Sequence, residues 1–225
     1  RERSLKLINE LDPKKRYIVV VAQEDGSIED PKPEDLYAYG TLAQVLKVFD
    51  MPDNSKSAIV QGISRVKVLE YTEKEPYFTA AVQSMDDKPI TDQLEIDALT
   101  TNLRQAFEDL MKVAPNLTEE HSGMLKNIQK PNRLTDRAIS VITISNMEKQ
   151  EILEELDIKI RMEKALNLIS REIQRIKLGE EIQTEVHDEI TKTQREYYLR
   201  EQMKAIKKEL GEDEGTVELK ELEDK

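Results

Sequence analysis

The sequence predicts an α+β protein in which a small β-rich domain is followed by a helical bundle and one very long, protruding helix. All eight prolines lie at or before Pro131, and eight of the ten aromatic residues lie at or before Phe107. The fifty-four residues from Asp157 to Leu210 contain no proline and one glycine. We therefore expect four regions: a β-rich domain at 1–89, a bundle at 90–156, a long helix at 157–211 whose first half packs on the bundle, and an acidic linker or tail at 212–225.

Composition restricts the possible partners. The 225 residues carry a net charge of −12 with a pI near 4.9, which argues against a nucleic-acid or anionic-membrane surface as the main partner. No apolar run approaches the length of a membrane span. There is no cysteine, which excludes thiolate chemistry and is compatible with the cytoplasmic location that we expect. The chain starts at Arg1 and not at methionine, which indicates a fragment of a longer protein.

Short β-type runs fill the first ninety residues. Ser4 is a candidate cap for a short helix that Asp12-Pro13 ends. Four or five strands so closely spaced indicate a small barrel or folded sheet and not βαβ units. The first run, Tyr17–Ala22, is dense enough in β-branched residues for a buried strand. The other strand-like runs are 37–49, 57–62, 66–71 and 77–85.

The pattern then changes to a helical period. Apolar residues recur every three or four positions from Ile96 to Val113, and Pro115 ends the run. Shorter helices are expected before Pro131, around Leu134 to Ile142, and after Asn146, a candidate N-cap. Short helices joined by short loops pack as a bundle.

The long helix would span roughly 80 Å if it is unbroken. A stripe suited to packing on the bundle is formed by Met162, Leu166, Ile169, Ile173 and Ile176. After Gly179 the apolar pattern moves to other faces, so no single coiled-coil register continues. Gly179 is either a kink or a tolerated surface glycine, and Gly211 is the expected C-terminal cap.

No catalytic, cofactor or metal motif is present. A phosphate-binding P-loop, a G-x-S-x-G turn and an H-E-x-x-H helix are all absent from the sequence. His121 and His187 lack neighbours for a metal set, and Ser55-Lys56-Ser57 reads as a solvated turn. No catalytic, cofactor-binding or metal-binding residue is therefore predicted.

The candidate contact residues for a partner or substrate are Tyr197, Tyr198, Leu199, Met203 and Ile206. Aromatic and methionine side chains are favoured at interfaces, and these lie on an otherwise highly charged helix. The alternative is local packing against a neighbouring helix of the same protein. Both interpretations require a surface that this chain alone does not cover.

Three segments resemble the region upstream of the ATPase module in Lon proteases. The first is Gln194-Arg-Glu-Tyr-Tyr-Leu-Arg-Glu-Gln-Met-Lys-Ala-Ile-Lys-Lys-Glu-Leu-Gly211; the others are Tyr39-Gly-Thr41 with Ile59-Val-Gln-Gly-Ile-Ser-Arg65, and Arg1-Glu-Arg-Ser-Leu5. The resemblance implies a PUA-like β-domain, a helical bundle and a long helix from a homohexameric, ATP-dependent AAA+ serine protease. The family's Walker motifs and serine–lysine pair have no matching positions here, so ATP and magnesium are expected in a downstream module. The family's opening apolar strand also has no match, which leaves the pairing at a sheet edge open.

The resemblance implies that this region recognises unfolded or damaged proteins and supports assembly of the hexamer. An RNA-binding PUA-like module is one alternative, although the acidity argues against it. A purely structural coiled-coil scaffold is another, and a stand-alone hydrolase is the last.

Overall fold

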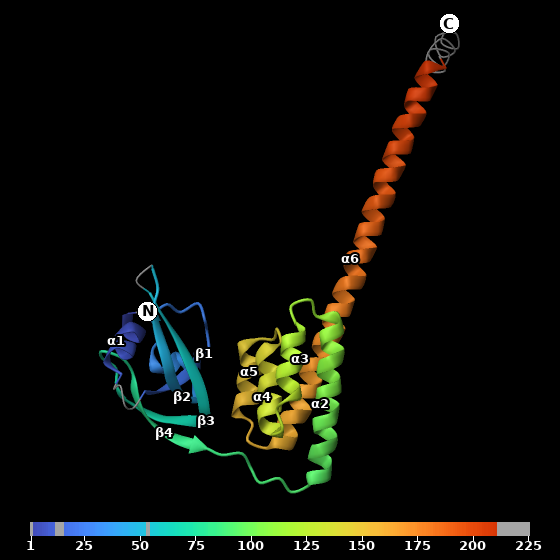
Figure 1. Ribbon diagram of the computed structural model, residues 1–225. Helices are drawn as coiled ribbons and strands as arrows, with labels where there is room; N and C mark the ends of the chain where they lie inside the picture. Colours follow the sequence, from blue (N-terminus) through green and yellow to red (C-terminus); the bar gives the residue numbers. More distant parts are fainter. Residues whose placement is uncertain (1, 12–15, 53–54, 211–225) are drawn as a thin grey trace. The chain divides into compact units, whose positions relative to one another are not determined.

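The computed structural model describes residues 2–11, 16–52 and 55–210 and divides the chain into two units, Arg1–Ile173 and Gln174–Lys225. The first unit contains a β-sheet lobe and a lobe of packed helices (Figure 1). The second unit contains the later part of the last helix. Gly211 and the expected acidic tail at 212–225 lie outside the described residues.

The sheet lobe is an antiparallel meander of four strands in the order β1-β2-β3-β4. The strands are β1 (Tyr17–Gln23), β2 (Leu36–Asp50), β3 (Lys56–Glu73) and β4 (Thr79–Met85). Helix α1 (Glu2–Glu10) precedes them, and a 3₁₀ turn, η1 (Pro33–Asp35), leads into β2. Because α1 already begins at Glu2, Ser4 lies inside it, and the prediction that Ser4 caps this helix was wrong.

Strand β3 is one element of 18 residues and not the two short strands that the sequence predicted. Gly62 does not end the strand, because it stays paired with Ala43 of β2. Irregularities beside Ala43 and after Val45 absorb the changes in register. The outer side of β3 is paired with β4 only from Arg65 onward. Lys56–Ile63 are all exposed, and no described strand pairs with their outer side.

The sheet lobe has a small core. Its fully buried apolar side chains are Ala43, Val45 and Val66. Strand β1 is only half-buried, with Val20 at 47% exposure, so the prediction of a buried strand at 17–22 was right about the strand and wrong about its burial. Gly40 is required where β1 approaches β2, because a Cβ there would lie 2.5 Å from the Val20 carbonyl oxygen.

The helical lobe contains α2 (Gln93–Val113), α3 (Glu119–Lys126), α4 (Pro131–Val141) and α5 (Asn146–Glu154). Asp92 caps α2 by accepting the Glu95 backbone N–H at 3.0 Å. The cap of α5 is Ser145, one residue before the predicted Asn146, and it forms a capping box with Glu148. The periodic apolar residues of the sequence form the core, which includes Ile96, Leu103, Leu110, Leu134, Ala138 and Ile152.

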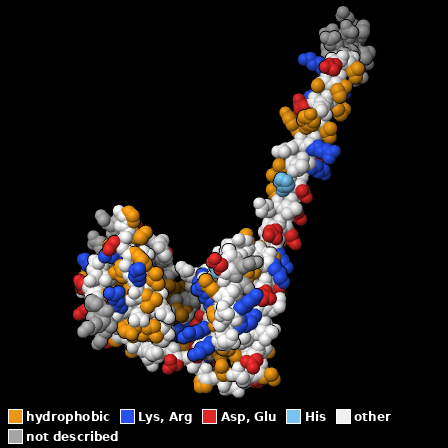
Figure 2. Space-filling view, in the orientation of Figure 1, with side chains coloured by type: hydrophobic (Ala, Val, Ile, Leu, Met, Phe, Trp, Pro, Cys, Tyr) orange, Lys and Arg blue, Asp and Glu red, His pale blue; other side chains and the backbone are white. Residues whose placement is uncertain are grey.

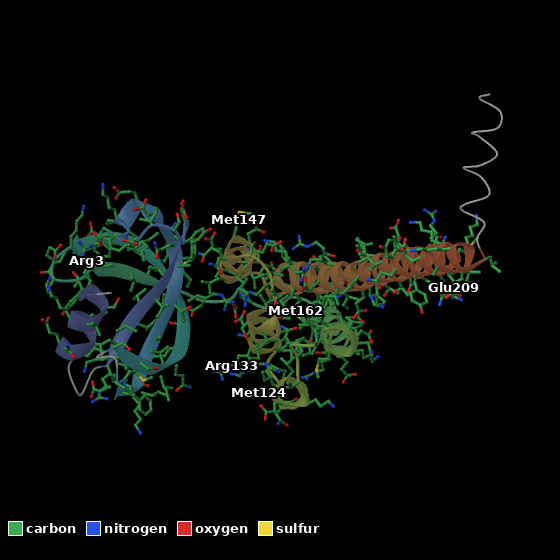
Figure 3. All side chains as sticks on the ribbon, turned by 90° about the horizontal axis from the view of Figure 1, so that it is seen from above. Arg3, Met124, Arg133, Met147, Met162 and Glu209 are labelled. Atoms are coloured by element: carbon green, nitrogen blue, oxygen red, sulfur yellow. The ribbon has the colours of Figure 1, made fainter. Side chains whose placement is uncertain are left out.

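The last helix, α6, is continuous from Ile158 to Glu209 and passes through Gly179 without a break. Met162 and Ile169 of the predicted stripe are fully buried, as Figure 3 shows for Met162 among the bundle helices. Leu166, Ile173 and Ile176 are only half-buried. Next to these positions the helix also buries Arg161, Ala165 and Glu172, so the packed face is more polar than predicted. None of the helices within the described residues contains an apolar stretch of the length that a membrane span requires.

Candidate functional site

The five predicted contact residues lie on α6 in the second unit, and all five are exposed. The exposed fractions run from 49% for Leu199 to 67% for Tyr197. The Tyr198 hydroxyl accepts a hydrogen bond from Gln202 Nε2 at 3.0 Å, one turn further along the helix. The others are Met203 and Ile206.

These five residues do not share one face of the helix. At about 100° per residue, Leu199, Met203 and Ile206 fall within roughly 60° of one another. Tyr197 falls roughly on the other side, and Tyr198 lies between. Two apolar stripes result: the first stripe is Ile182, Val186, Ile190 and Tyr197, and the second stripe is Leu199, Met203, Ile206 and Leu210. All eight residues are exposed.

A buried arginine joins the two lobes of the first unit. Arg161 of α6 has a fully buried side chain and forms an ion pair with Asp87, which follows β4. Its Nε donates to the Glu155 carbonyl oxygen at 2.7 Å, and a second nitrogen lies 3.8 Å from Asp136 Oδ1. The Asp157 carboxylate, one turn before Arg161, accepts the Lys159 backbone N–H at 3.1 Å at the start of α6.

The surroundings of Asp87 keep it ionised. Burial raises the pKa of this carboxyl, but hydrogen bonds from Arg161 and from Asn132 Nδ2, at 2.8 Å, outweigh the burial and leave the pKa below its ordinary value. The Arg161 Nη1, 3.8 Å from Asp136 Oδ1, makes no hydrogen bond among the described residues. A buried arginine is stable only when opposite charges balance it. Asp87 and Asp136 provide that balance.

Arg65 and Gln150 connect the sheet directly to the bundle. Arg65 Nε donates to the Leu153 carbonyl oxygen at 2.9 Å, and its guanidinium pairs with Asp136 Oδ1 at 2.5 Å. Gln150 Nε2 donates to the Tyr39 carbonyl oxygen at 3.1 Å. These contacts join β2 and β3 to α4 and α5.

Beside these connections lies an open cleft of about 780 Å³, which we call the interlobe cleft. One wall is the sheet face that carries Val20, Thr41 and Arg65, with Ile63 at its edge. The other wall belongs to α4 and α5, and in Figure 3 Arg133 lies on the side of the bundle next to the sheet lobe. Sequence reasoning missed this site because its residues come from five elements and the loop before α4, and they show no common spacing.

Two of the titratable residues considered in the sequence, His121 and Lys56, have structural roles. His121 Nδ1 accepts the Thr118 backbone N–H at 3.1 Å at the start of α3. Lys56 pairs with Asp50 at 2.7 Å across the β2–β3 turn. Within residues 2–11, 16–52 and 55–210 there is no group of three metal-ligating side chains.

Comparisons with known proteins place this architecture in one family. The sequence model of the ATP-dependent protease La (Lon) substrate-binding domain matches residues 1–171. Lon protease of Koribacter versatilis is 43% identical over 227 residues, and that of Dictyoglomus thermophilum is 38% identical over 226. Each comparison covers the whole of this chain but only 28% of the relative, so the chain spans little more than a quarter of these proteins.

Solved structures agree on the fold. The N-terminal domain of Mycobacterium avium complex Lon protease has a TM-score of 0.51 at 19% identity and covers 68% of this chain and 90% of its own. The Lon N-terminal domain protein from Xanthomonas campestris has a TM-score of 0.52 at 18% identity and covers 74% of this chain and 84% of its own. The α+β prediction is confirmed. With a family match across most of its length and relatives that align with all of it, the chain belongs to the Lon protease family and contains its substrate-binding domain.

Proposed function

We propose that this chain recognises unfolded or damaged polypeptides for a cytoplasmic, ATP-dependent Lon-type serine protease. In this proposal the chain is not catalytic, and ATP, magnesium and peptide-bond hydrolysis belong to other parts of the parent protein. The family description, which is that of a substrate-binding domain, supports the first half of the proposal.

The observation that carries the proposal is the apolar surface of the sheet lobe. Folded proteins rarely expose many large apolar side chains close together unless they bind something. Figure 2 shows such side chains gathered over the sheet lobe. The exposed members on and next to the β2–β3 hairpin are Leu46, Phe49, Met51, Ile59, Val60 and Ile63. An unfolded polypeptide offers matching apolar groups, which a native protein buries.

The direct test compares one protein in two states. A reduced and alkylated protein that stays unfolded should bind the chain, whereas its native form should not, and fluorescence anisotropy measures both. Equal binding of the two forms, or no binding of either, would contradict substrate recognition. Ile59→Ser with Val60→Ser removes two exposed aliphatic groups and should weaken the binding, while Lys177→Ser with Lys207→Ser on α6 should not.

We also propose that the exposed part of α6 contributes to assembly of a homohexamer. Support comes from the two apolar stripes, each of which leaves side chains about half exposed. Sedimentation velocity at increasing concentrations should detect oligomers of the chain. Ile190→Asn with Ile206→Asn, one change in each stripe, should shift the distribution to monomer. Oligomers without any polypeptide binding would favour the scaffold alternative.

A further inference from the structure

We propose that the interlobe cleft binds an extended polypeptide segment that combines acidic with aliphatic side chains. This inference rests on the proposed function and names the site and the chemistry of the segment that is recognised. Three features of the cleft support it: its charge, its apolar side chains and the fixed position of its walls.

Positive charge collects in the cleft although the whole chain is acidic. The charged residues that line it are four cations and one anion, against a net charge of −12 for the protein. The anion, Asp136, is already paired with Arg65 and lies near Arg161. The remaining cations are Arg133, Arg137 and Lys149.

The remaining cations are available to a ligand. Among the described residues, neither Arg133 nor Lys149 has an ion-pair partner, and the Arg137 guanidinium donates a hydrogen bond to the sulfur of Met124 at 2.9 Å. Arg133 and Arg137 are one helical turn apart on α4, and Lys149 is on the neighbouring α5. Unpaired cations on two adjacent helices create a local positive field that attracts carboxylates.

Aliphatic side chains accompany these charges. Val20 and Ile63 are 47% and 51% exposed, and Ile128 also lines the cleft. No aromatic residue is among the lining residues. Single-stranded nucleic acids bind through aromatic stacking as well as through positive charge, so the cleft suits a polypeptide better than RNA. Its volume of about 780 Å³ lies in the range of ligand-binding clefts.

The walls are held in position before binding. Arg65 and Gln150 tie the sheet to α4 and α5 with hydrogen bonds of 2.9 Å and 3.1 Å. A site whose walls are fixed in the free protein loses less conformational entropy when it binds. The cations and aliphatic groups are therefore presented at a defined spacing.

The test uses the whole 225-residue chain and two fluorescein-labelled synthetic peptides of equal length. One peptide alternates leucine with aspartate, and the other alternates leucine with lysine. We expect the aspartate peptide to bind about tenfold more tightly by fluorescence anisotropy, because two or three cations face its carboxylates. Equal affinities, or a preference for the lysine peptide, would overturn the inference.

Charge reversal locates the site. Arg133→Glu with Lys149→Glu should remove the preference for aspartate and favour the lysine peptide. Lys177→Glu with Lys207→Glu on α6 changes the net charge equally and should leave the preference as it is. Arg133→Gln with Lys149→Gln, the milder pair, should abolish the preference without reversing it if the reversed variant does not fold. An unchanged preference in folded cleft variants would overturn the inference.

The unfolded protein from the previous test separates the two proposals. If it binds the original chain and the cleft variants equally well, the cleft assignment fails and substrate recognition stands. If it binds neither the original chain nor the cleft variants, the cleft assignment and substrate recognition both fail. A single-stranded RNA that binds more tightly than the aspartate peptide, and loses this binding in the charge-reversed variant, would overturn the assignment to polypeptide.

A dye attached to a single introduced cysteine reports the location of peptide binding by a measurement that does not depend on charge. Because the chain has no cysteine, Ile63→Cys can be labelled selectively with an environment-sensitive dye. Adding the aspartate peptide should shift the dye's emission at Ile63 but not at a matched Ile182→Cys site on α6. An equal response at the two sites would overturn the location.

Discussion

The two parts of α6 share one secondary structure but differ in what stabilises it. Up to Ile173 the helix belongs to the first unit, and Met162, Ala165 and Ile169 are fully buried. From Gln174 onward its large apolar side chains are about half exposed, including Ile182, Val186 and Ile190. Packing therefore supports the first part, whereas local helix propensity and nearby charge pairs support the second.

The comparison shows what a periodic apolar pattern can and cannot predict. In both parts apolar residues recur at helical spacing, so the pattern predicts a helix with an apolar face. It does not say whether this protein supplies the partner for that face. Three predictions test the difference between the two parts, and a fourth tests a charge contact of the packed part.

The largest loss of stability is expected when a buried side chain on the packed face of α6 is truncated. Ile169→Ala should cost about 3–5 kcal/mol of unfolding free energy, because the side chain is fully buried and its truncation leaves a cavity. Ile190→Ala, the same change on the exposed part, should cost at most about 0.5 kcal/mol in the monomer. Urea unfolding followed by circular dichroism measures both. Equal losses at the two positions would remove the distinction.

Removing the buried cation should have the next largest effect. Arg161→Met should cost about 3 kcal/mol, because Asp87 would remain partly buried without its partner. Arg195→Met, on the exposed part of α6, serves as the control and should change the unfolding free energy by less than about 0.5 kcal/mol. A loss below about 1 kcal/mol for Arg161→Met would mean that this ion pair contributes little to joining the lobes.

The stability of the exposed part of α6 should depend on the helix propensity of its residues. Gly179→Ala should stabilise the helix by about 1 kcal/mol, since a Cβ at this position meets no atom within 4 Å. Helical content at 222 nm should rise, and its loss on heating should shift to a higher temperature. An unchanged or lower helical content would show that Gly179 is needed for a local bend.

The smallest effect on stability is expected from the titration of one carboxylate as the pH is lowered. The Arg171 guanidinium, followed by the backbone N–H and hydroxyl of Ser145, lowers the pKa of Glu148 from 4.5 to about 2. Because this pKa is depressed in the folded state, its stabilisation is complete above about pH 4.5 and is lost as the pH falls towards 2. Glu148→Gln should reduce the fall in melting temperature over this window, and Arg171→Gln should do the same. An identical fall in the unchanged chain and both variants would contradict the assignment.

The helical bundle was largely predictable from the sequence. Its apolar residues keep a period of three or four, and prolines such as Pro115 and Pro131 mark the boundaries. The sheet was predicted less well. Gly62 looks like an interruption in the sequence, but the bulged pairing with β2 keeps β3 continuous past it. Register is a property of two strands together, which a single run of residues does not determine.

The interlobe cleft and its supporting ion pairs were not predictable. Arg65, Asp87, Asp136 and Arg161 lie far apart in the sequence, and each resembles an ordinary surface charge. Only the packing of both lobes brings them together. The residues expected to contact partners, Tyr197 to Ile206, were correctly placed on a helix, but their division between two faces follows from the helical geometry.

The open outer side of β3 affects how this chain can be handled. Lys56–Ile63 carry one charge and several β-branched residues, without the prolines or repeated lysines that usually keep a strand edge from joining a second molecule. Concentrated samples are therefore expected to form intermolecular sheets through this segment during storage. Dilute stocks and an added charge at Ile59 would extend the working life of a preparation.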